Sequence, residues 1–544
     1  MTATTTHFDT DVLIVGGGPV GLTLAIDLGR RGVECILLEK KPEPQFLPKM
    51  ERVNARSMEL FRRIGLADTI RTKGLRTDAS MDVYLVTALN EPPLLRVPFP
   101  SVEEARVQIR NTHDGSLPLE PYQLISQYTM EPLLKSIAEK LPGVDVRFGT
   151  ECAVFQQNDT GVSARTQGAD GKSGTLRTRY LIGCDGGTSP VRQQLGIKLQ
   201  GEGPLSHLRQ GLFYCEDLYE RLPIGNGPGR GRHWHVIDDR NTVLVMQDST
   251  KHWSLHSAVE SDEAMHALFG KVIGVPMNYE MLSCSPWRMN LLLAERYRAG
   301  RVFLAGDACH LVIPTGGLGM NTGVGDAFDL SWKLAATLQG WGGPNLLDSY
   351  EIERRQVGER NVGASRFATR SRRKWRSAYR PEFRDSTPAG AQVRNALLAI
   401  ATIEQNRNQE MTGAELGYRY ADSPIVMNIP GGPQHLFQDY EPSTWPGARL
   451  PHMWLNDGSA LHDRIPTEGY TILRLGTAPT DAAALEAALR SFGTTVTTLV
   501  IPDRTVREVY EYDLFLLRPD LHIVWRGNAL PDDVAGLAST ATGH

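Results

Sequence analysis

The sequence predicts an α/β protein that begins with a Rossmann-like dinucleotide-binding domain and carries a second, antiparallel sheet as an insertion. Three observations support this prediction. An apolar run at residues 11–15 leads directly into a glycine-rich turn and a helix. Residues 201–284 contain stretches in which apolar and polar side chains alternate, as they do in antiparallel sheets. The chain of 544 residues also exceeds one ordinary core, so it should form several domains.

The first 40 residues form a complete βαβ pattern. The turn at residues 16–21 reads Gly-Gly-Gly-Pro-Val-Gly, a helical pattern follows at 22–29, and a second strand at 34–38 ends at Glu39. The glycines permit a tight turn and a close approach to a pyrophosphate, which the helix N-terminus would bind through N–H groups. Glu39 is placed to bind a ribose diol and would repel a 2′-phosphate. This unit alone does not distinguish FAD from NAD.

Two later strands also end in an aspartate beside a glycine. The first leads into Asp185-Gly186, and the second, at residues 301–305, leads into Gly306-Asp307. A glycine-rich turn at residues 314–321 then precedes a helical segment predicted to run from Gly323 to Leu338. Taken alone, an aspartate after a strand is more often a turn or cap residue than a ligand.

Taken in order, these three motifs resemble the single-component flavoprotein aromatic hydroxylases, the group that includes phenol hydroxylase and p-hydroxybenzoate hydroxylase. The resemblance covers most of residues 10–360. It implies bound FAD, NADH or NADPH as a transient electron donor and O2 as co-substrate. It also implies hydroxylation of a phenolic ring through a flavin C4a-hydroperoxide, with a simple, alkyl-, halo- or nitro-substituted phenol or a catechol as substrate. The alternatives are a flavin oxidase or dehydrogenase of another small molecule, and a non-catalytic flavoprotein.

The motifs and the resemblance together predict which residues contact the cofactor. In this family the residue matching Asp307 bonds the ribityl chain, and the backbone matching residues 319–321 approaches the pyrimidine edge of the flavin. Lys49 stands where the family often has an arginine, and it lacks the bidentate fork. Gln127 is either a flavin contact or an exposed residue that opens a helix. The predicted cofactor-binding residues are Gly16, Gly18, Pro19, Val20, Gly21, Glu39, Lys40, Lys49, Gln127, Asp185, Gly306, Asp307, Pro314, Gly317, Gly319, Met320 and Asn321.

Hydroxylation of a phenol benefits from a general base, because removing the phenolic proton sends electron density into the ring. Glu51 is the candidate base, since it falls where phenol hydroxylase has an acid; the alternative is an exposed glutamate paired with Arg52. His235 is the second catalytic candidate. Three tryptophans of the inserted sheet are weighed as substrate-lining or core residues: Trp234, Trp253 and Trp287.

The predicted domain organisation is as follows. A discontinuous FAD-binding domain comprises residues 8–80, 115–200 and 285–360, and the substrate-binding sheet comprises 81–114 and 201–284. A helical linker spans residues 361–440, in which the basic run at 370–376 is expected to face solvent. Residues 441–544 resemble the thioredoxin-like C-terminal domain of the phenol-hydroxylase branch. They contain no CxxC, so a dithiol redox role is excluded and a structural or dimerisation role, as in a homodimer, is expected.

The composition narrows the range of partners and compartments. The net charge is −4, which gives no reason to expect nucleic acid or an anionic membrane as a partner. The N-terminus lacks the pattern of a signal peptide, and no apolar run approaches the roughly 18 residues that span a bilayer. The six cysteines are scattered without metal-ligand spacing, so no metal site and a reduced, cytoplasmic protein are expected.

Overall fold

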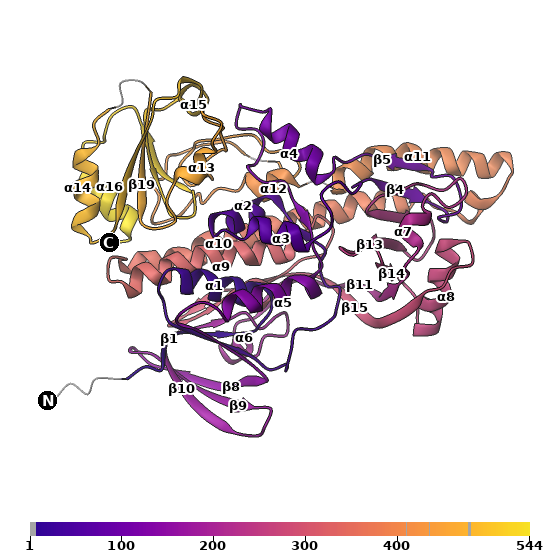
Figure 1. Cartoon of the computed structure of the whole chain (residues 1–544), viewed down its shortest axis with the longest axis horizontal. Helices are drawn as coiled ribbons and strands as arrows, with labels where there is room; N and C mark the ends of the chain where they lie inside the picture. Colours follow the sequence, from indigo (N-terminus) through magenta and orange to yellow (C-terminus); the bar gives the residue numbers. More distant parts are fainter. Residues whose placement is uncertain (1–6, 410, 435, 477–479) are drawn as a thin grey trace.

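The computed structural model describes residues 7–409, 411–434, 436–476 and 480–544. Figure 1 shows three sheets: an N-terminal sheet around β1, a middle sheet around β11 and β15, and a C-terminal sheet around β19. Helices α9 and α10 run through the centre of the molecule between them. The predicted fold class is confirmed.

The N-terminal sheet has a parallel core in the order β17-β10-β1-β2-β7. β16 pairs antiparallel with the edge strand β17, and β8 and β9 form an antiparallel extension on the first half of β10. The strands are β1 (Thr10–Val15), β2 (Cys35–Glu39), β7 (Val144–Phe148), β8 (Thr150–Gln157), β9 (Val162–Gly168), β10 (Ser173–Gly183), β16 (Arg298–Ala299) and β17 (Val302–Leu304). The central strands carry apolar runs, such as residues 12–15 of β1 and 35–38 of β2, as expected where helices cover a parallel sheet.

Helix α1 (Pro19–Arg30) and helix α9 (Gly319–Leu338) pack closely against each other. A Cβ on Gly323 would lie 2.5 Å from Val20 Cγ2, so a side chain there would push the two helices apart. α9 begins at Gly319 and not at Gly323, four residues earlier than predicted. The helix N-terminus therefore falls within the glycine-rich motif itself.

The middle sheet has the order β18-β15-β11-β14-β13-β12-β4-β5, and only β12 and β4 pair in parallel. Its long strands β11 and β15 cross the predicted boundaries at residues 201 and 284. The strands are β4 (Val83–Val86), β5 (Leu95–Val97), β11 (Leu199–Tyr214), β12 (His233–Val236), β13 (Val243–Met246), β14 (His252–Ser257), β15 (Glu280–Ala294) and β18 (His310–Leu311). The prediction of a mostly antiparallel sheet is confirmed.

The C-terminal sheet has the order β20-β19-β21-β22, with β19 and β20 parallel and the other pairs antiparallel. This is the predicted thioredoxin-like arrangement of strands and helices. The elements are β19 (Tyr470–Leu475), α14 (Ala483–Ser491), β20 (Val496–Ile501), α15 (Arg504–Tyr510), β21 (Leu514–Leu517), β22 (Ile523–Gly527) and α16 (Val534–Thr542).

The remaining elements are the long helices α10 and α11 and a number of short segments. They are β3 (Arg52–Val53), α2 (Ala55–Arg63), α3 (Ala67–Lys73), α4 (Val102–Arg110), β6 (Gln123–Leu124), α5 (Gln127–Ala138), α6 (Pro190–Gln194), α7 (Leu218–Arg221), α8 (Asp262–Ile273), the 3-10 turns η1 (Gly306–Ala308) and η2 (Pro381–Arg384), α10 (Pro344–Arg376), α11 (Pro388–Gln409), α12 (Thr412–Leu416) and α13 (Leu461–Arg464). Within the described ranges no helix combines the length and apolar character needed to cross a bilayer.

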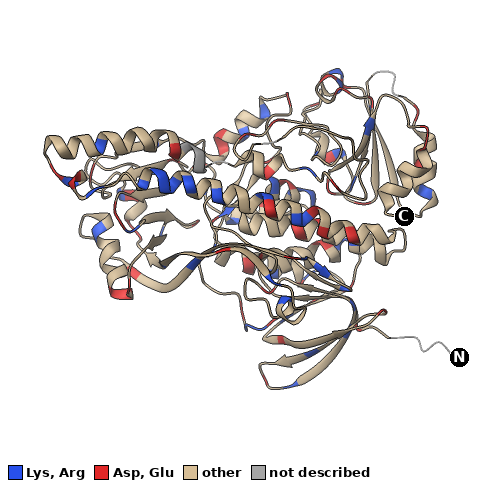
Figure 2. Cartoon of the chain, turned by 180° about the vertical axis from the view of Figure 1, so that it is seen from behind, with Lys and Arg blue, Asp and Glu red and all other residues tan. Residues whose placement is uncertain are grey.

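The predicted helical linker is dominated by α10 and α11, which pack against each other. The expectation that the basic run 370–376 faces solvent is right for Arg370, Arg373 and Lys374 but wrong for the other two arginines. Arg376 is buried and donates to the carbonyls of Val236 and Thr242, and Arg372 is partly buried. The side of this stretch of α10 that carries Trp375 and Arg376 packs onto the middle sheet. Figure 2 shows the predominantly basic last turns of α10.

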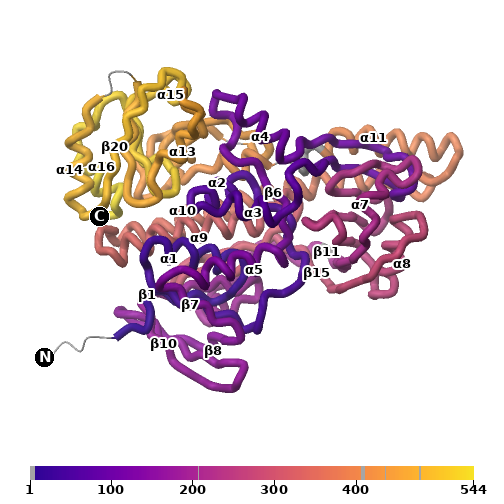
Figure 3. The backbone as a smooth tube through the Cα atoms, in the orientation of Figure 1, coloured from indigo at the N-terminus to yellow at the C-terminus, as the bar shows by residue number. Residues whose placement is uncertain are grey.

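The C-terminal domain is anchored to α2, which lies between it and the central helices (Figure 3). Arg449 Nε donates to Glu59 Oε2 at 2.7 Å, and both side chains are buried. Arg62 pairs with Asp463 at 2.6 Å. α4 also lies at this interface, because Trp454 donates to its Ile109 carbonyl.

Candidate active site

The three sequence motifs meet at one edge of the N-terminal sheet. Because β17, β10, β1 and β2 are adjacent and parallel, their carboxyl ends bring Asp307, Asp185, the turn 16–21 and Glu39 into one row. In open α/β sheets ligands bind at this edge. The row is therefore the expected position of a dinucleotide.

The turn after β1 has the geometry of a phosphate cradle. Gly16 has φ +115°, and a Cβ there would lie 2.3 Å from the Cys184 carbonyl oxygen. A Cβ on Gly21 would lie 2.0 Å from the Gly16 carbonyl, so neither position accepts another residue. α1 begins at Pro19 after Gly18, and no side chain caps its first turn. The N–H groups of that turn can therefore bind an anion.

Glu39 lies beside this cradle at the end of β2. Its Oε2 accepts a hydrogen bond from the Gly17 N–H at 2.8 Å, and its Oε1 accepts one from the Lys41 N–H at 3.0 Å. These bonds hold the carboxylate beside the cradle, where it could accept hydrogen bonds from a ribose diol. The neighbouring Lys40 is exposed.

Asp307 follows β17 in the turn η1. Its side chain reaches solvent, yet desolvation by the surrounding protein raises its pKa, which His310 and Lys49 partly counteract. An accessible carboxylate that is still desolvated lies within a recess and not on an open face. The exposed Lys49 is close enough to Asp307 to offer a cation near the same recess.

Asp185 and Gln127, two further predicted cofactor contacts, form hydrogen bonds within the protein. Asp185 Oδ2 accepts from the Val191 N–H at 3.0 Å and so caps α6, which is the ordinary role of an aspartate after a strand. Gln127 opens α5, and its amide donates to Glu131 at 2.6 Å. Glu131 lies close to the cradle, since its carboxylate is 3.9 Å from a Cβ built on Gly18.

The N-terminus of α9 completes the row. Gly319 and Met320 form its uncapped first turn, and Gly317 has φ +66° in the loop before it, which begins at the exposed Pro314. The Asn321 side chain is engaged within the protein: Oδ1 accepts from the Asn54 N–H at 2.9 Å, and Nδ2 donates to the Arg52 carbonyl at 3.1 Å. Only the backbone at these positions is thus open to a cofactor.

Those bonds also fix the loop that carries Glu51. Its other side is tied to the middle sheet, because Gln210 of β11 donates to the Pro48 carbonyl, and to α5, because the Gln127 N–H donates to the Met50 carbonyl at 3.1 Å. Glu51 therefore lies where the α9 N-terminus meets the middle sheet.

Glu51 Oε1 lies 3.3 Å from His233 Nε2. Burial raises the pKa of Glu51, but the neighbouring His233, with smaller contributions from His256 and Arg232, outweighs it and lowers the pKa well below 4.5. Burial lowers the pKa of His233 itself, and that of His256 to about 4, so both imidazoles are uncharged near neutral pH. The sequence reasoning missed His233, although strand alternation puts it on the same face as His235.

His235 is fully buried, and its ring packs 6.2 Å from that of Trp375 on α10. Trp234 and Trp253 point to the opposite face and belong to the core of the middle sheet. Trp287 is only partly buried, and its ring lies 5.7 Å from that of His256, on the Glu51 side.

Arg372 is a further missed residue. It lies one turn before Arg376 and Trp375 on the side of α10 that packs on β12. Its positive charge lowers the pKa of both His233 and His256, and burial lowers its own pKa to about 10, so it stays charged at neutral pH. Its Nε is buried without a hydrogen-bond partner.

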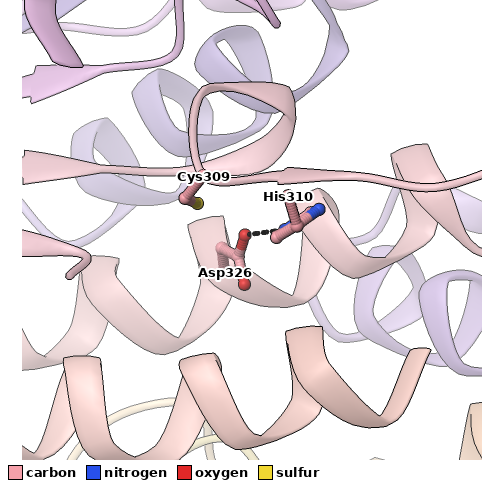
Figure 4. Close-up of side chains that lie close together, drawn as sticks. All are labelled: Cys309, His310 and Asp326. Atoms are coloured by element: carbon pink, nitrogen blue, oxygen red, sulfur yellow. Dashed lines mark hydrogen bonds and ion pairs between the residues drawn. The ribbon is translucent and has the colours of Figure 1, made fainter. Parts of the chain in front are cut away.

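Cys309, His310 and Asp326 form a buried cluster behind the Gly306–Asp307 turn (Figure 4), and their donor atoms lie within 4.8 Å of one another. Burial raises the pKa of the Cys309 thiol far above its usual value. The oxygens of Asp326 already accept from His310, Arg354 and the Gly306 N–H. The cluster is therefore assigned to hydrogen bonding within the protein.

The residues along the sheet edge fit a flavin dinucleotide. The cradle at residues 16–21 has space beside Gly18 for a pyrophosphate, Glu39 is held for a ribose, and Asp307 offers a desolvated acceptor for a polyol chain. The uncapped α9 N-terminus suits the ring edge that gains negative charge on reduction.

Comparison with known proteins identifies the family. The model of the FAD binding domain matches residues 9–365, and that of the aromatic-ring hydroxylase C-terminal domain matches residues 443–543. The chain is 32% identical to the FAD-dependent monooxygenase apdD of Emericella nidulans, over 95% of this chain and 88% of that protein. It is 31% identical to aklavinone 12-hydroxylase RdmE of Streptomyces purpurascens, over 97% of each chain.

Solved structures agree with this assignment. RebC, a rebeccamycin biosynthetic enzyme, with reduced flavin has a TM-score of 0.88 at 32% identity, covering 98% of this chain and 99% of that chain. Aklavinone-11 hydroxylase in a ternary complex with FAD and aklavinone has a TM-score of 0.83 at 29% identity, covering 99% and 100%. The predicted resemblance is confirmed: the chain belongs to the FAD-dependent aromatic-ring hydroxylases and is a flavoprotein monooxygenase.

Proposed function

We propose that this monooxygenase hydroxylates a fused polycyclic aromatic compound that carries an ionisable ring hydroxyl, with NADH or NADPH as electron donor. The observation that carries the proposal is the pairing of Glu51 with His233 beside Arg372, at the junction of the α9 N-terminus and the middle sheet. Two of the relatives carry names that refer to aklavinone. The initial expectation of a simple phenol finds no support among these relatives.

The chain's own residues would prepare the ring. Bound FAD, once reduced, supplies the activation of O2 and the transferred oxygen atom. Glu51 has too low a pKa to take a proton from a phenol, whose pKa lies near 10. His233 is uncharged near neutral pH and can accept that proton, while the carboxylate of Glu51 stabilises the resulting imidazolium. We therefore assign the base to His233 and an orienting role to Glu51.

Arg372 would recognise the ionised oxygen. Its guanidinium remains charged at neutral pH and lies near the two histidines, so it favours the phenolate over the phenol in the same site. The partly buried ring of Trp287 supplies an apolar surface on which a fused ring system can pack.

A substrate panel tests this function. Phenol, catechol and 4-nitrophenol are compared with hydroxylated naphthoquinones and anthraquinones for stimulated oxidation of NADH and of NADPH, with O2 uptake and product mass recorded. We expect the polycyclic compounds alone to give coupled oxidation with gain of one oxygen atom. Coupled hydroxylation of the small phenols only would contradict the proposal.

Two arginine variants test the role of Arg372 in the site. Arg372→Met should raise KM for the active polycyclic compound about tenfold, the size of one charge-assisted hydrogen bond, and leave FAD bound. Arg370→Met is the matched control, because Arg370 lies on the same helix but is exposed. Equal KM values for both variants would refute the role of Arg372.

A further inference from the structure

Asp326 of α9 holds the turn that presents Asp307. Its Oδ2 accepts hydrogen bonds from the Gly306 N–H at 3.0 Å and from His310 Nε2 at 2.7 Å. These two donors lie on either side of Asp307 in the chain, and the Asp326 side chain is fully buried (Figure 4). Gly306 has φ +65°, so the turn depends on a conformation that most residues disfavour. The position of Asp307 therefore depends on Asp326.

The other oxygen of Asp326 binds Arg354 of α10. Arg354 Nε donates to Asp326 Oδ1 at 2.8 Å, and its Nη2 donates to the Thr322 carbonyl at 3.0 Å. A Cβ on Gly325 would lie 2.7 Å from Nη2, so glycine at that position lets the guanidinium lie flat against α9. The planar fork of arginine thus fixes the orientation of the Asp326 carboxylate.

Arg354 in turn contacts residues that the C-terminal domain holds. Its Nη1 donates to the Tyr420 hydroxyl at 3.1 Å. The Tyr420 ring stacks on His522 with a centroid distance of 4.3 Å, and the Arg518 guanidinium lies 5.0 Å over the same ring. His522 and Arg518 belong to the stretch around β21 and β22 of the thioredoxin-like sheet.

We propose that Asp326, Arg354 and Tyr420 are positioning residues through which the C-terminal domain holds the FAD-contacting turn Gly306–Asp307 in place. This assigns to the domain a role in flavin retention that needs no cysteine. It depends on flavin binding alone and not on which aromatic compound is the substrate. Failure of the substrate panel would therefore leave it unaffected.

The proposal is tested by titrating the apoprotein with FAD and measuring binding from the quenching of flavin fluorescence. Asp326→Asn should weaken FAD binding roughly tenfold to a hundredfold, because Asn lacks the charge that orients Arg354. The matched control is Asp27→Asn in α1. Asp27 is also buried and accepts hydrogen bonds from Arg31 and from Ser331 of α9, and neither partner belongs to the turn or to the Arg354–Tyr420 path. This control should lower the melting temperature and leave FAD affinity within about twofold.

Tyr420→Phe tests the contact between Tyr420 and Arg354, through which the C-terminal domain is proposed to act, because it removes only the hydroxyl that accepts from Arg354. A loss of about threefold to tenfold in FAD affinity is expected. Wild-type affinity in Asp326→Asn, or equal losses in Asp326→Asn and Asp27→Asn at matched stability, would overturn the proposal. Should Asp326→Asn fail to fold, Tyr420→Phe and Arg354→Lys decide it, since unchanged FAD affinity in both would also overturn it.

Discussion

Replacing Glu51 by Gln tests the proposed support of the base His233 by Glu51, because it removes the charge and keeps the size. The two groups are 3.3 Å apart, so an imidazolium at His233 would gain about 5 kcal/mol from the carboxylate at an effective dielectric constant of about 20. The side chain of Glu51 is 32% exposed, and solvent screening should reduce this to about 2–3 kcal/mol.

Glu51→Gln should therefore slow hydroxylation about tenfold to a hundredfold at neutral pH, with FAD still bound. The assay is product formed in a single turnover of the reduced enzyme, measured across pH. The defect should shrink as the pH rises through the pKa of the substrate hydroxyl, because an ionised substrate needs no base.

A double-mutant cycle separates the two roles at this site. If Glu51 acts through His233, the double variant Glu51→Gln/His233→Asn should be no slower than His233→Asn alone. His235→Asn is the control, since His235 is buried and its ring packs against Trp375 of α10. Wild-type rates in Glu51→Gln with a weakly acidic substrate, or additive losses in the double variant, would refute the reasoning.

Two further outcomes are expected. Glu39→Ala and Asp307→Ala should each raise the FAD dissociation constant about tenfold to a hundredfold by loss of a charge-assisted hydrogen bond; unchanged constants in flavin titration would contradict both contacts. Glu59→Gln should cost about 3–5 kcal/mol in urea unfolding, because Arg449 is left buried without its partner. Burial raises the pKa of Glu59, but Arg449 outweighs it and lowers the pKa from 4.5 to about 2. The pair's stabilisation is then present above pH 4.5 and lost as the pH falls through 2, an acid sensitivity that Glu59→Gln should lack.

The catalytic side of the site shows the limit of sequence reasoning. His233 and His235 lie on the same face of β12, so alternation alone does not separate them. The packing of α10 decides between them, because Trp375 covers His235 while His233 stays beside Glu51. Arg372 was missed for a related reason: it lies in a basic run, which is usually a solvated face, and only the packing of α10 shows that its side of the helix is covered.

The sequence by itself determined the cofactor edge, because each contact there belongs to a short segment whose backbone needs a particular residue. Gly16 and Gly21 fill positions with no room for a Cβ, and Glu39 ends the strand beside them. Only the tertiary structure decided which side chains meet across the domains. Glu51, His233 and Arg372 come from three segments far apart in the chain, and their pKa values depend on mutual distance and burial. Neither quantity is encoded in local sequence, since both arise from how the sheets and helices pack.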